Sequence, residues 1–198
     1  MFSEKEKTLI ESVIQEGGEI WENPKLAPIK TKIKETIKPK LEDQCCYCRK
    51  NLHNEFNMVI DIEHVLPQKK FPNYIFEPLN LSLACKRCNM QIKKDDISFF
   101  LNDNSLENTP FNKENYLFIH PNLDNYFENM IVCTFIINNK KLIKYKSLRP
   151  KGVYTYKYFE LEKLEINSFN KMQDIKDDVL SDAIDIDIKN EVQKLLKI

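Results

Sequence analysis

The chain has 198 residues, a formal net charge of zero, 42% hydrophobic residues and 30% charged residues. This composition predicts a folded chain with a real hydrophobic core, arranged as one domain with elaborations or as two small domains. It contains no run of about 18 apolar residues, which argues against a membrane span, and its polar N-terminus does not resemble a signal peptide. We therefore expect a cytoplasmic protein in which paired cysteines stay reduced and bind metal.

Lysines concentrate in two stretches, residues 25–40 and 138–151, while the C-terminal tail is acidic. The zero net charge argues against a protein that coats nucleic acid by bulk electrostatics. The two lysine-rich stretches are compatible with ordinary solvated faces or with local phosphate contacts, and the sequence leaves both open.

Two helices are predicted near the N-terminus. Ser3 and Glu6 form a capping-box pattern, and apolar residues then recur at helical spacing up to Gly17. A second helix is expected from about Pro28, with one apolar face that consists of Ile29, Ile33 and Ile37.

The middle of the chain alternates extended and turn signals. Residues 58–62 and 80–84 have strand-like patterns, and a proline-rich loop lies between them. A helix is expected to begin at or just after Asn89. Beyond a polar loop at residues 102–115, a β-hairpin is predicted from Phe127 to Tyr145, with its turn at Asn138 and Asn139. Two or three helices are predicted after about Phe159.

Two CxxC motifs, Cys45-x-x-Cys48 and Cys85-x-x-Cys88, are the strongest chemical signal in the chain. Each CxxC turn presents two sulfurs to one ion, so two turns supply the complete ligand set of a structural zinc. Cys46 is an alternative to Cys45, although the regular spacing favours Cys45. Cys133 lies in an apolar run and is predicted to be a core residue.

The residues between and after the two motifs can supply hydrolytic chemistry. Asp61, Glu63 and His64 lie close together in the sequence, and Asn89 directly follows Cys88. A neutral histidine can take a proton from water, and oxygen donors such as those of Glu63 and Asn89 suit Mg²⁺. Because Asp61 and Glu63 share one face of a strand, a turn or bulge is needed to gather all three side chains.

These motifs resemble the HNH nucleases, also called His-Me finger or ββα-metal nucleases, in the branch that carries a four-cysteine zinc. The resemblance covers about residues 44–96. The matching text is Cys45-Cys-Tyr-Cys48, Asp61-Ile-Glu-His-Val-Leu-Pro67 and Asn80-Leu-Ser-Leu-Ala-Cys-Lys-Arg-Cys-Asn89. The later stretch from Phe118 to Asp124 is similar to a segment of Septu-like anti-phage nucleases, in which an HNH protein works with an ATPase.

The resemblance implies a role for each matching residue. His64 would be the general base, Glu63 and Asn89 would bind a catalytic Mg²⁺ or Mn²⁺, Asn80 would position the base or its loop, and Asp61 would assist the metal. The chain departs from the family where a lysine often stands three residues after Asn89, because Ile92 is there and lysines follow at 93 and 94. Glu63 is also longer than the more common Asp.

The resemblance therefore implies an α+β fold in which a structural zinc stabilises a ββα core at residues 41–100. N-terminal helices at 1–40 and a hairpin with helices at 101–198 would flank it, and the latter is a candidate partner-binding region. The implied function is a metal-dependent endonuclease that hydrolyses DNA, acts in anti-phage defence with an ATPase partner and needs no membrane. The alternatives are an inactive zinc-stabilised binding module and a stand-alone restriction or homing-type HNH nuclease, and RNA remains open as a substrate.

Overall fold

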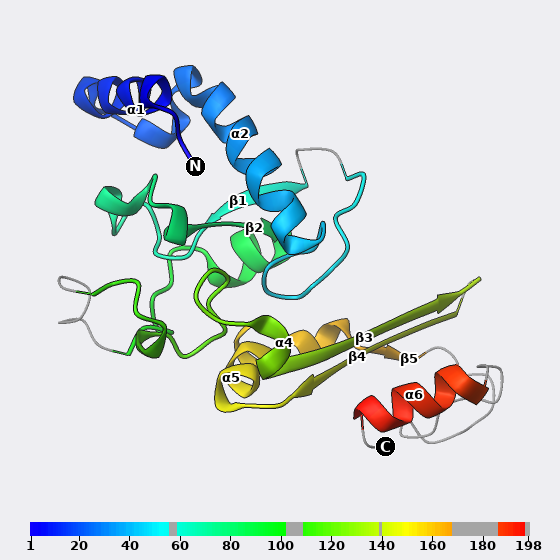
Figure 1. The fold of residues 1–198 in the computed structure, drawn as a ribbon. Helices are drawn as coiled ribbons and strands as arrows, with labels where there is room; N and C mark the ends of the chain where they lie inside the picture. The colour runs from blue at the N-terminus through cyan, green and yellow to red at the C-terminus, as the bar shows by residue number, and fades with distance from the viewer. Residues whose placement is uncertain (56–58, 102–108, 139, 168–185, 197–198) are drawn as a thin grey trace. The chain divides into compact units, whose positions relative to one another are not determined.

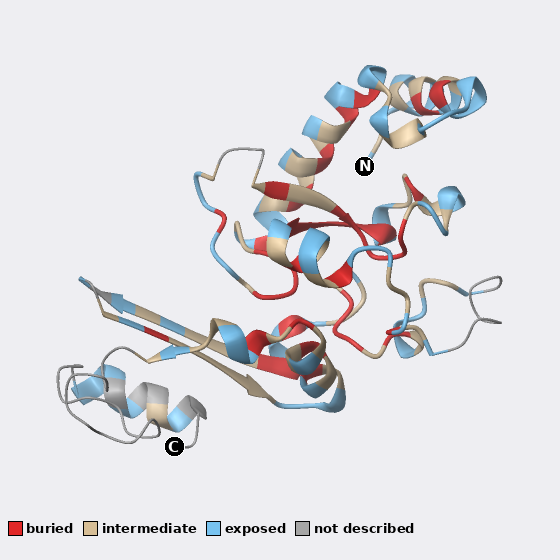
Figure 2. Cartoon of the chain, turned by 180° about the vertical axis from the view of Figure 1, so that it is seen from behind, coloured by how far each residue is buried: buried red, intermediate tan, exposed pale blue. Residues whose placement is uncertain are grey.

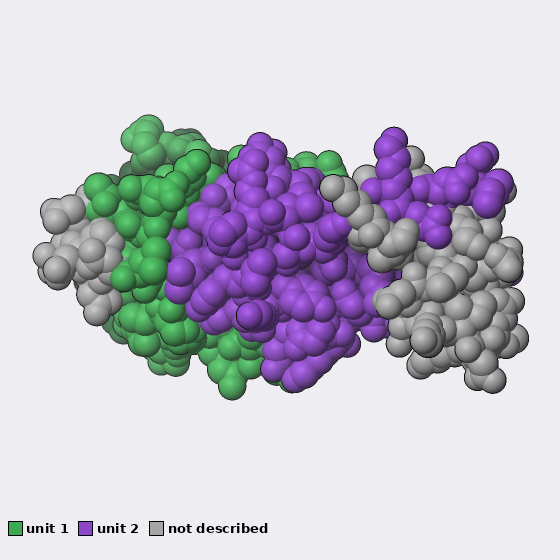
Figure 3. All heavy atoms as spheres, turned by 90° about the horizontal axis from the view of Figure 1, so that it is seen from below, with its two compact units in different colours: residues 1–115, 120–123 green, residues 116–119, 124–198 purple. Residues whose placement is uncertain are grey.

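The computed structural model describes residues 1–55, 59–101, 109–138, 140–167 and 186–196 (Figure 1). Two compact units divide the chain, and Figure 3 colours them separately. Unit 1 comprises residues 1–115 and 120–123, and unit 2 comprises residues 116–119 and 124–198. Both units combine helices with one small sheet, so the fold is mixed α and β, as predicted. The division into segments 1–40, 41–100 and 101–198 stays a prediction.

Unit 1 begins with the two predicted helices. Helix α1 (Glu4–Glu16) starts after Ser3, whose N–H and hydroxyl donate to the Glu6 carboxylate at 2.7 and 2.8 Å. Gly17 ends this helix with a φ of 73°, a left-handed conformation that glycine adopts readily. Helix α2 (Ala27–Ile37) buries the face formed by Ile29, Ile33 and Ile37. Both helix predictions are confirmed.

The centre of unit 1 is an antiparallel pair of short strands, β1 (Ile60–His64) and β2 (Leu81–Cys85). All five residues of β2 are buried (Figure 2), and helix α2 packs against both strands. The strand predictions hold with shifted boundaries. β1 extends through Glu63 and His64 because these residues pair with β2, while Met58 lies outside the described residues.

A helical turn, η6 (Arg87–Lys93), follows β2 and completes a strand–strand–helix order. It begins two residues before the predicted start at Asn89. It is a π-helix, in which the N–H of Lys94 donates to the carbonyl of Asn89, five residues back, at 2.8 Å. Such turns hold an extra residue and occur frequently at functional sites.

Unit 2 is built on an antiparallel sheet with the strand order β3-β4-β5. Its strands are β3 (Met130–Ile137), β4 (Lys140–Ser147) and β5 (Ile166–Asn167), and its helices are α4 (Tyr126–Asn129), α5 (Pro150–Tyr158) and α6 (Ile186–Leu196).

The predicted hairpin is confirmed, although its expected first residues belong to α4. Helix α5, β5 and the close approach of Gly152 to α4 were not predicted. A Cβ atom at Gly152 would lie 2.1 Å from the carbonyl oxygen of Asn129. Of the predicted helical tail, residues 168–185 lie outside the described residues.

Short 3-10 helices connect the main elements: Ile20–Glu22, Pro24–Leu26, Lys38–Leu41, Pro72–Tyr74, Pro78–Asn80, Lys113–Asn115 and Leu161–Leu164. Two of them lie in the loop between β1 and β2, where the sequence predicted proline-marked turns. None of the helices in the described parts of the chain combines the length and apolar character that a bilayer span requires.

Candidate active site

Four cysteine sulfurs converge in the interior of unit 1. The Sγ atoms of Cys45, Cys48, Cys85 and Cys88 lie within 4.8 Å of one another, and all four residues are buried. The sulfurs of Cys48 and Cys85 are 3.8 Å apart. That separation matches the edge of a tetrahedron whose Zn–S bonds are about 2.3 Å long. The cluster could therefore bind zinc.

Cys45 belongs to this cluster, and its neighbour Cys46 does not. The N–H of Cys85 donates to the sulfur of Cys45 at 3.3 Å, a bond that favours a thiolate. Burial acts to raise the pKa of Cys45, but hydrogen bonds from the surrounding thiols outweigh it and lower that pKa well below its ordinary value. Burial raises the pKa of Cys46 well above its ordinary value. Of the two cysteines that the sequence left open, the geometry of the cluster includes Cys45.

Glu63 lies in the protein interior, with its side chain fully buried. Its Oε1 accepts hydrogen bonds from the Tyr47 hydroxyl and the Lys93 ammonium, both at 3.0 Å. Lys93 is equally buried and also donates to the carbonyl of His64 at 2.9 Å. Burial raises the pKa of Glu63, although Lys93 and Tyr47 act in the opposite direction. These contacts tie the first cysteine turn to β1 and η6.

His64 is the last residue of β1, and only 8% of its surface is exposed. Its Nε2 lies 3.1 Å from the carbonyl oxygen of Ile75. A carbonyl can only accept, so Nε2 carries the proton and Nδ1 keeps its lone pair. Burial lowers the pKa of the ring to about 4, against the opposing effect of the hydrogen bond to Ile75. The imidazole is therefore neutral at pH 7, with Nδ1 as its proton acceptor.

Asn80 fixes the loop that carries Ile75. Its Oδ1 accepts from the N–H of Leu66 at 2.7 Å, and its Nδ2 donates to the carbonyls of Leu66 and Tyr74 at 3.1 and 2.9 Å. Asn80 is fully buried, so these bonds replace the hydrogen bonds to water that its side chain loses on folding. The Asn80 side chain therefore holds the loop whose Ile75 carbonyl binds His64.

Asp61 and Asn89 share a cavity of about 570 Å³ with His64. The Asn89 Nδ2 donates to Asp61 Oδ2 at 3.2 Å, and the Lys86 ammonium contacts Asp61 Oδ1 at 3.1 Å. Four lysines are among the residues that line this cavity: Lys30, Lys34, Lys86 and Lys94. Glu63 does not line it. The structure therefore brings His64, Asp61 and Asn89 together and places Glu63 in the adjacent interior.

Three residues that contact these groups were not singled out from the sequence. Tyr47 and Lys93 bind Glu63, and Trp21 contacts the ring of His64. The sequence marks Ile92 as the position where HNH nucleases often have a lysine, but it gives no sign that the π-helical turn places Lys93 in the interior. Trp21 is the only tryptophan in the chain, but nothing in its sequence context connects it to His64.

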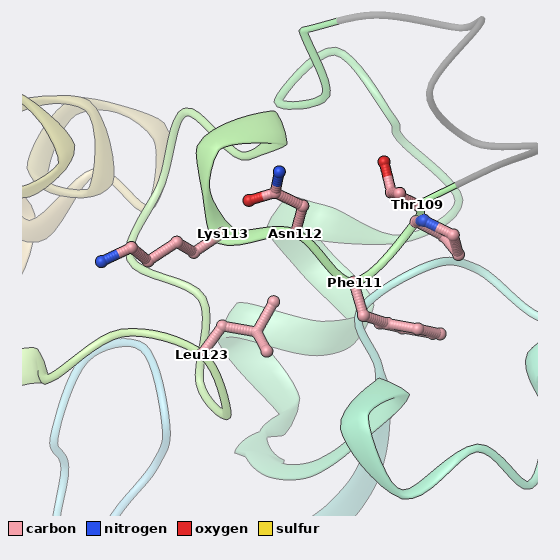
Figure 4. Close-up of a pocket in the computed structure, with 6 residues that line it drawn as sticks. Thr109, Phe111, Asn112, Lys113 and Leu123 are labelled. Carbon is pink, nitrogen blue, oxygen red and sulfur yellow. The ribbon is translucent and has the colours of Figure 1, made fainter.

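The other two histidines and Cys133 do not line this cavity. His53 is exposed, and its Nδ1 lies 2.7 Å from Asp43 Oδ2. His120 is buried and its Nδ1 accepts from the N–H of Asn122 at 3.1 Å. Cys133 is only partly buried, so the predicted core position is wrong in degree. A second cavity, also about 570 Å³, lies between residues 109–113 and Leu123 (Figure 4) and brings together no acidic or imidazole groups.

One comparison with known proteins gives a match. A segment of 85 residues is 31% identical to the Septu protein PtuB of Bacillus thuringiensis. The match covers 43% of this chain and 30% of that protein's length. No family model matches the chain, and no solved structure matches it.

Replacement of Cys85 by serine tests the metal centre. Cys85→Ser removes one thiolate from a set of four, so we expect loss of bound zinc and a melting temperature lower than that of the unaltered protein. Elemental analysis and thermal unfolding measure the two effects. Cys46→Ser is the matched control, because it changes a neighbouring buried thiol outside the cluster and should keep zinc. Full zinc content in Cys85→Ser would contradict the assignment.

Proposed function

We propose that this protein is a metal-dependent HNH endonuclease that hydrolyses DNA phosphodiester bonds and acts in anti-phage defence. The proposal rests mainly on the protonation of His64 and on the groups that surround its ring. Its ring is neutral, its Nε2 is engaged by a backbone carbonyl, and it shares a cavity with a carboxylate, an amide and several lysines. Those groups match the needs of phosphodiester hydrolysis.

His64 would act as the general base. Its Nδ1 takes a proton from a water molecule, and the water oxygen attacks phosphorus. The bond from phosphorus to the leaving oxygen breaks, and that oxygen takes a proton from a second water molecule to leave as a hydroxyl group. The Asn80 bonds to the loop and the Ile75 carbonyl would keep Nδ1 as the accepting nitrogen throughout. General base catalysis of this kind contributes about 10²–10⁴-fold to the rate.

The donor set fits a hard divalent ion such as Mg²⁺ or Mn²⁺. Asp61 offers a carboxylate, and Asn89 uses its Nδ2 in the bond to Asp61, which leaves its oxygen as the coordinating atom. Glu63 Oε2 is buried and has no hydrogen-bond partner within the described residues. A bound ion would neutralise charge on the phosphate and activate water, and it would keep several water ligands of its own.

Asp61 and Glu63 differ in the free energy that is needed to separate each carboxylate from its lysine partner. Asp61 pairs with Lys86, whose side chain is half exposed, and a pair of this kind contributes only about 0–1 kcal/mol. Glu63 pairs with a buried lysine, and separating a buried pair costs about 3–5 kcal/mol. We therefore assign Asp61 and Asn89 as the first donors to the ion, and Glu63 would join them only in exchange with Lys93.

The lysines that line the cavity would bind the phosphate backbone. Lys30 and Lys34 come from α2, and Lys86 and Lys94 come from either end of η6. Because the net charge of the whole chain is zero, we expect weak intrinsic affinity for DNA and a need for recruitment.

We propose recruitment by an ATPase because the sequence resembles Septu-like nucleases, which work with such a partner, and the similarity to a Septu protein supports a role in the same kind of defence. The N-terminal helices and the acidic tail are the candidate contacts. A structural zinc in the four-thiolate cluster completes the proposal.

A second candidate function is an inactive zinc-stabilised binding module. The observation that favours it is the burial of Glu63 against Lys93, since the resemblance places a catalytic metal ligand there. A third candidate function is a stand-alone restriction or homing-type HNH nuclease, which would act without an ATPase partner.

Replacement of His64 tests catalysis. We expect His64→Ala to abolish the nicking of supercoiled plasmid in Mn²⁺, because the proton acceptor is lost. Zinc content and circular dichroism should match those of the unaltered protein. His53→Ala is the control, since that ring is exposed and lies outside the cavity. Plasmid nicking by His64→Ala at the unaltered rate would refute the assigned base.

Two carboxylate variants test the metal donors by affinity. We expect Asp61→Asn to weaken Mn²⁺ binding, measured by calorimetry, by about 10–100-fold, while the melting temperature stays unchanged. Glu63→Gln should mainly destabilise the fold, because it leaves Lys93 buried without a charge partner. Unaltered Mn²⁺ affinity in Asp61→Asn, together with its loss in a folded Glu63→Gln protein, would assign the ion to Glu63.

Co-expression tests the partner. An ATPase encoded in the same gene neighbourhood should elute with this protein in size-exclusion chromatography as one complex. Separate elution, combined with specific cleavage by this protein alone, would favour the stand-alone nuclease.

A further inference from the structure

The imidazole of His64 contacts an aromatic residue that lies outside the segment resembling HNH nucleases. Trp21 belongs to the 3-10 helix Ile20–Glu22, which precedes α2. Its ring centroid is 4.4 Å from that of His64, and the two planes meet at 85°. Such an edge-to-face contact is a favoured arrangement of aromatic rings and depends on their orientation. Trp21 also lines the cavity that His64 shares with Asp61 and Asn89.

Trp21 is itself fixed by contacts on other sides. Its ring lies 5.9 Å from Phe76 at an angle of 43°, and the Lys30 ammonium lies 4.9 Å from its centroid. Phe76 directly follows Ile75, whose carbonyl binds His64 Nε2. One short stretch of loop therefore supports both the imidazole and the tryptophan that contacts it.

A single hydrogen bond does not fix a ring. The bond from Nε2 to Ile75 determines which nitrogen carries the proton, but it allows the imidazole plane to rotate about the bond. A second contact across the ring plane removes that rotation. Trp21 supplies this contact, and a shift of about 1 Å in a reacting group can cost about 100-fold in rate.

We infer that Trp21 is a positioning residue that holds His64 in one orientation, so that the N-terminal segment completes the hydrolytic site. This inference rests on the proposed function, in which His64 is the base. Trp21 touches the base and not the reacting atoms. The N-terminal segment is thus part of the site and not a detachable appendage.

Nuclear magnetic resonance tests the positioning without any cleavage reaction. The chain has only three histidines, so the ¹⁵N–¹H spectrum of the imidazoles in the zinc-loaded full chain is simple, and His64→Gln identifies the His64 signals. We expect the unaltered protein to show one sharp set of His64 ring signals, with the proton on Nε2, because the ring holds one orientation. Trp21→Leu keeps apolar volume without a ring edge, so the His64 ring signals should broaden or split between orientations while the proton stays on Nε2. Trp21→Phe retains a ring and should restore the single sharp set of signals.

Kinetics provide the second measurement. We expect Trp21→Leu to lower kcat by about 10–100-fold with KM unchanged, and Trp21→Phe to recover most of that loss. One sharp set of His64 ring signals in Trp21→Leu, or a kcat equal to that of the unaltered protein, would overturn the inference. Absence of cleavage by the unaltered protein would instead contradict the proposed function, and the ring signals would still decide the role of Trp21.

Discussion

The convergence of four cysteine sulfurs is the constraint on which unit 1 depends. Its sheet has only two strands of five residues, and a pair of that size is marginally stable in water without further support. Binding of structural zinc supplies about 10–16 kcal/mol in zinc-finger peptides, which is comparable with the entire stability of a typical domain. The sulfurs join the turn at Cys45 to the end of β2 and the start of η6. A metal at this point would therefore fix the strands and the helical turn that carry the candidate catalytic groups.

The connection from the sulfur cluster to the cavity runs through buried polar contacts. Tyr47 lies between Cys45 and Cys48 and binds Glu63, which pairs with Lys93. Lys93 in turn donates to the carbonyl of His64. A buried ion pair contributes little net stability but is costly to break once formed, so it favours a single arrangement of its neighbours. Through these contacts, an ordered turn at residues 45–48 keeps the candidate base, His64, in position.

Local patterns in the sequence predicted much of the framework. The capping box at Ser3, the isoleucine face of α2, the two short strands and the hairpin around Asn138 follow from spacing and turn chemistry, which act over a few residues. The convergence of the four cysteines was also predictable, because two CxxC motifs match the geometry of one ion. The boundary of β1 was less predictable, since pairing with β2 and not local propensity extends it through His64.

The remaining features depend on contacts between distant parts of the chain. No local pattern reveals that Lys93 reaches Glu63, because this pairing depends on the π-helical turn after Asn89. The contact of Trp21 with His64 joins residues that are separated by helix α2 and the cysteine turn. Gly152 likewise gives no signal until α5 packs against Asn129. In each case tertiary packing determines the role, and sequence spacing alone does not contain it.

Anomalous X-ray scattering from crystals soaked in Mn²⁺ tests the central claim most directly, because it locates each metal by its element. We predict a zinc peak at the centre of the four cysteine sulfurs. We also predict a manganese peak in the cavity, within coordination distance of Asp61 and Asn89 and next to His64. A zinc peak elsewhere, or a cavity without manganese while the crystals bind it at other positions, would contradict the account.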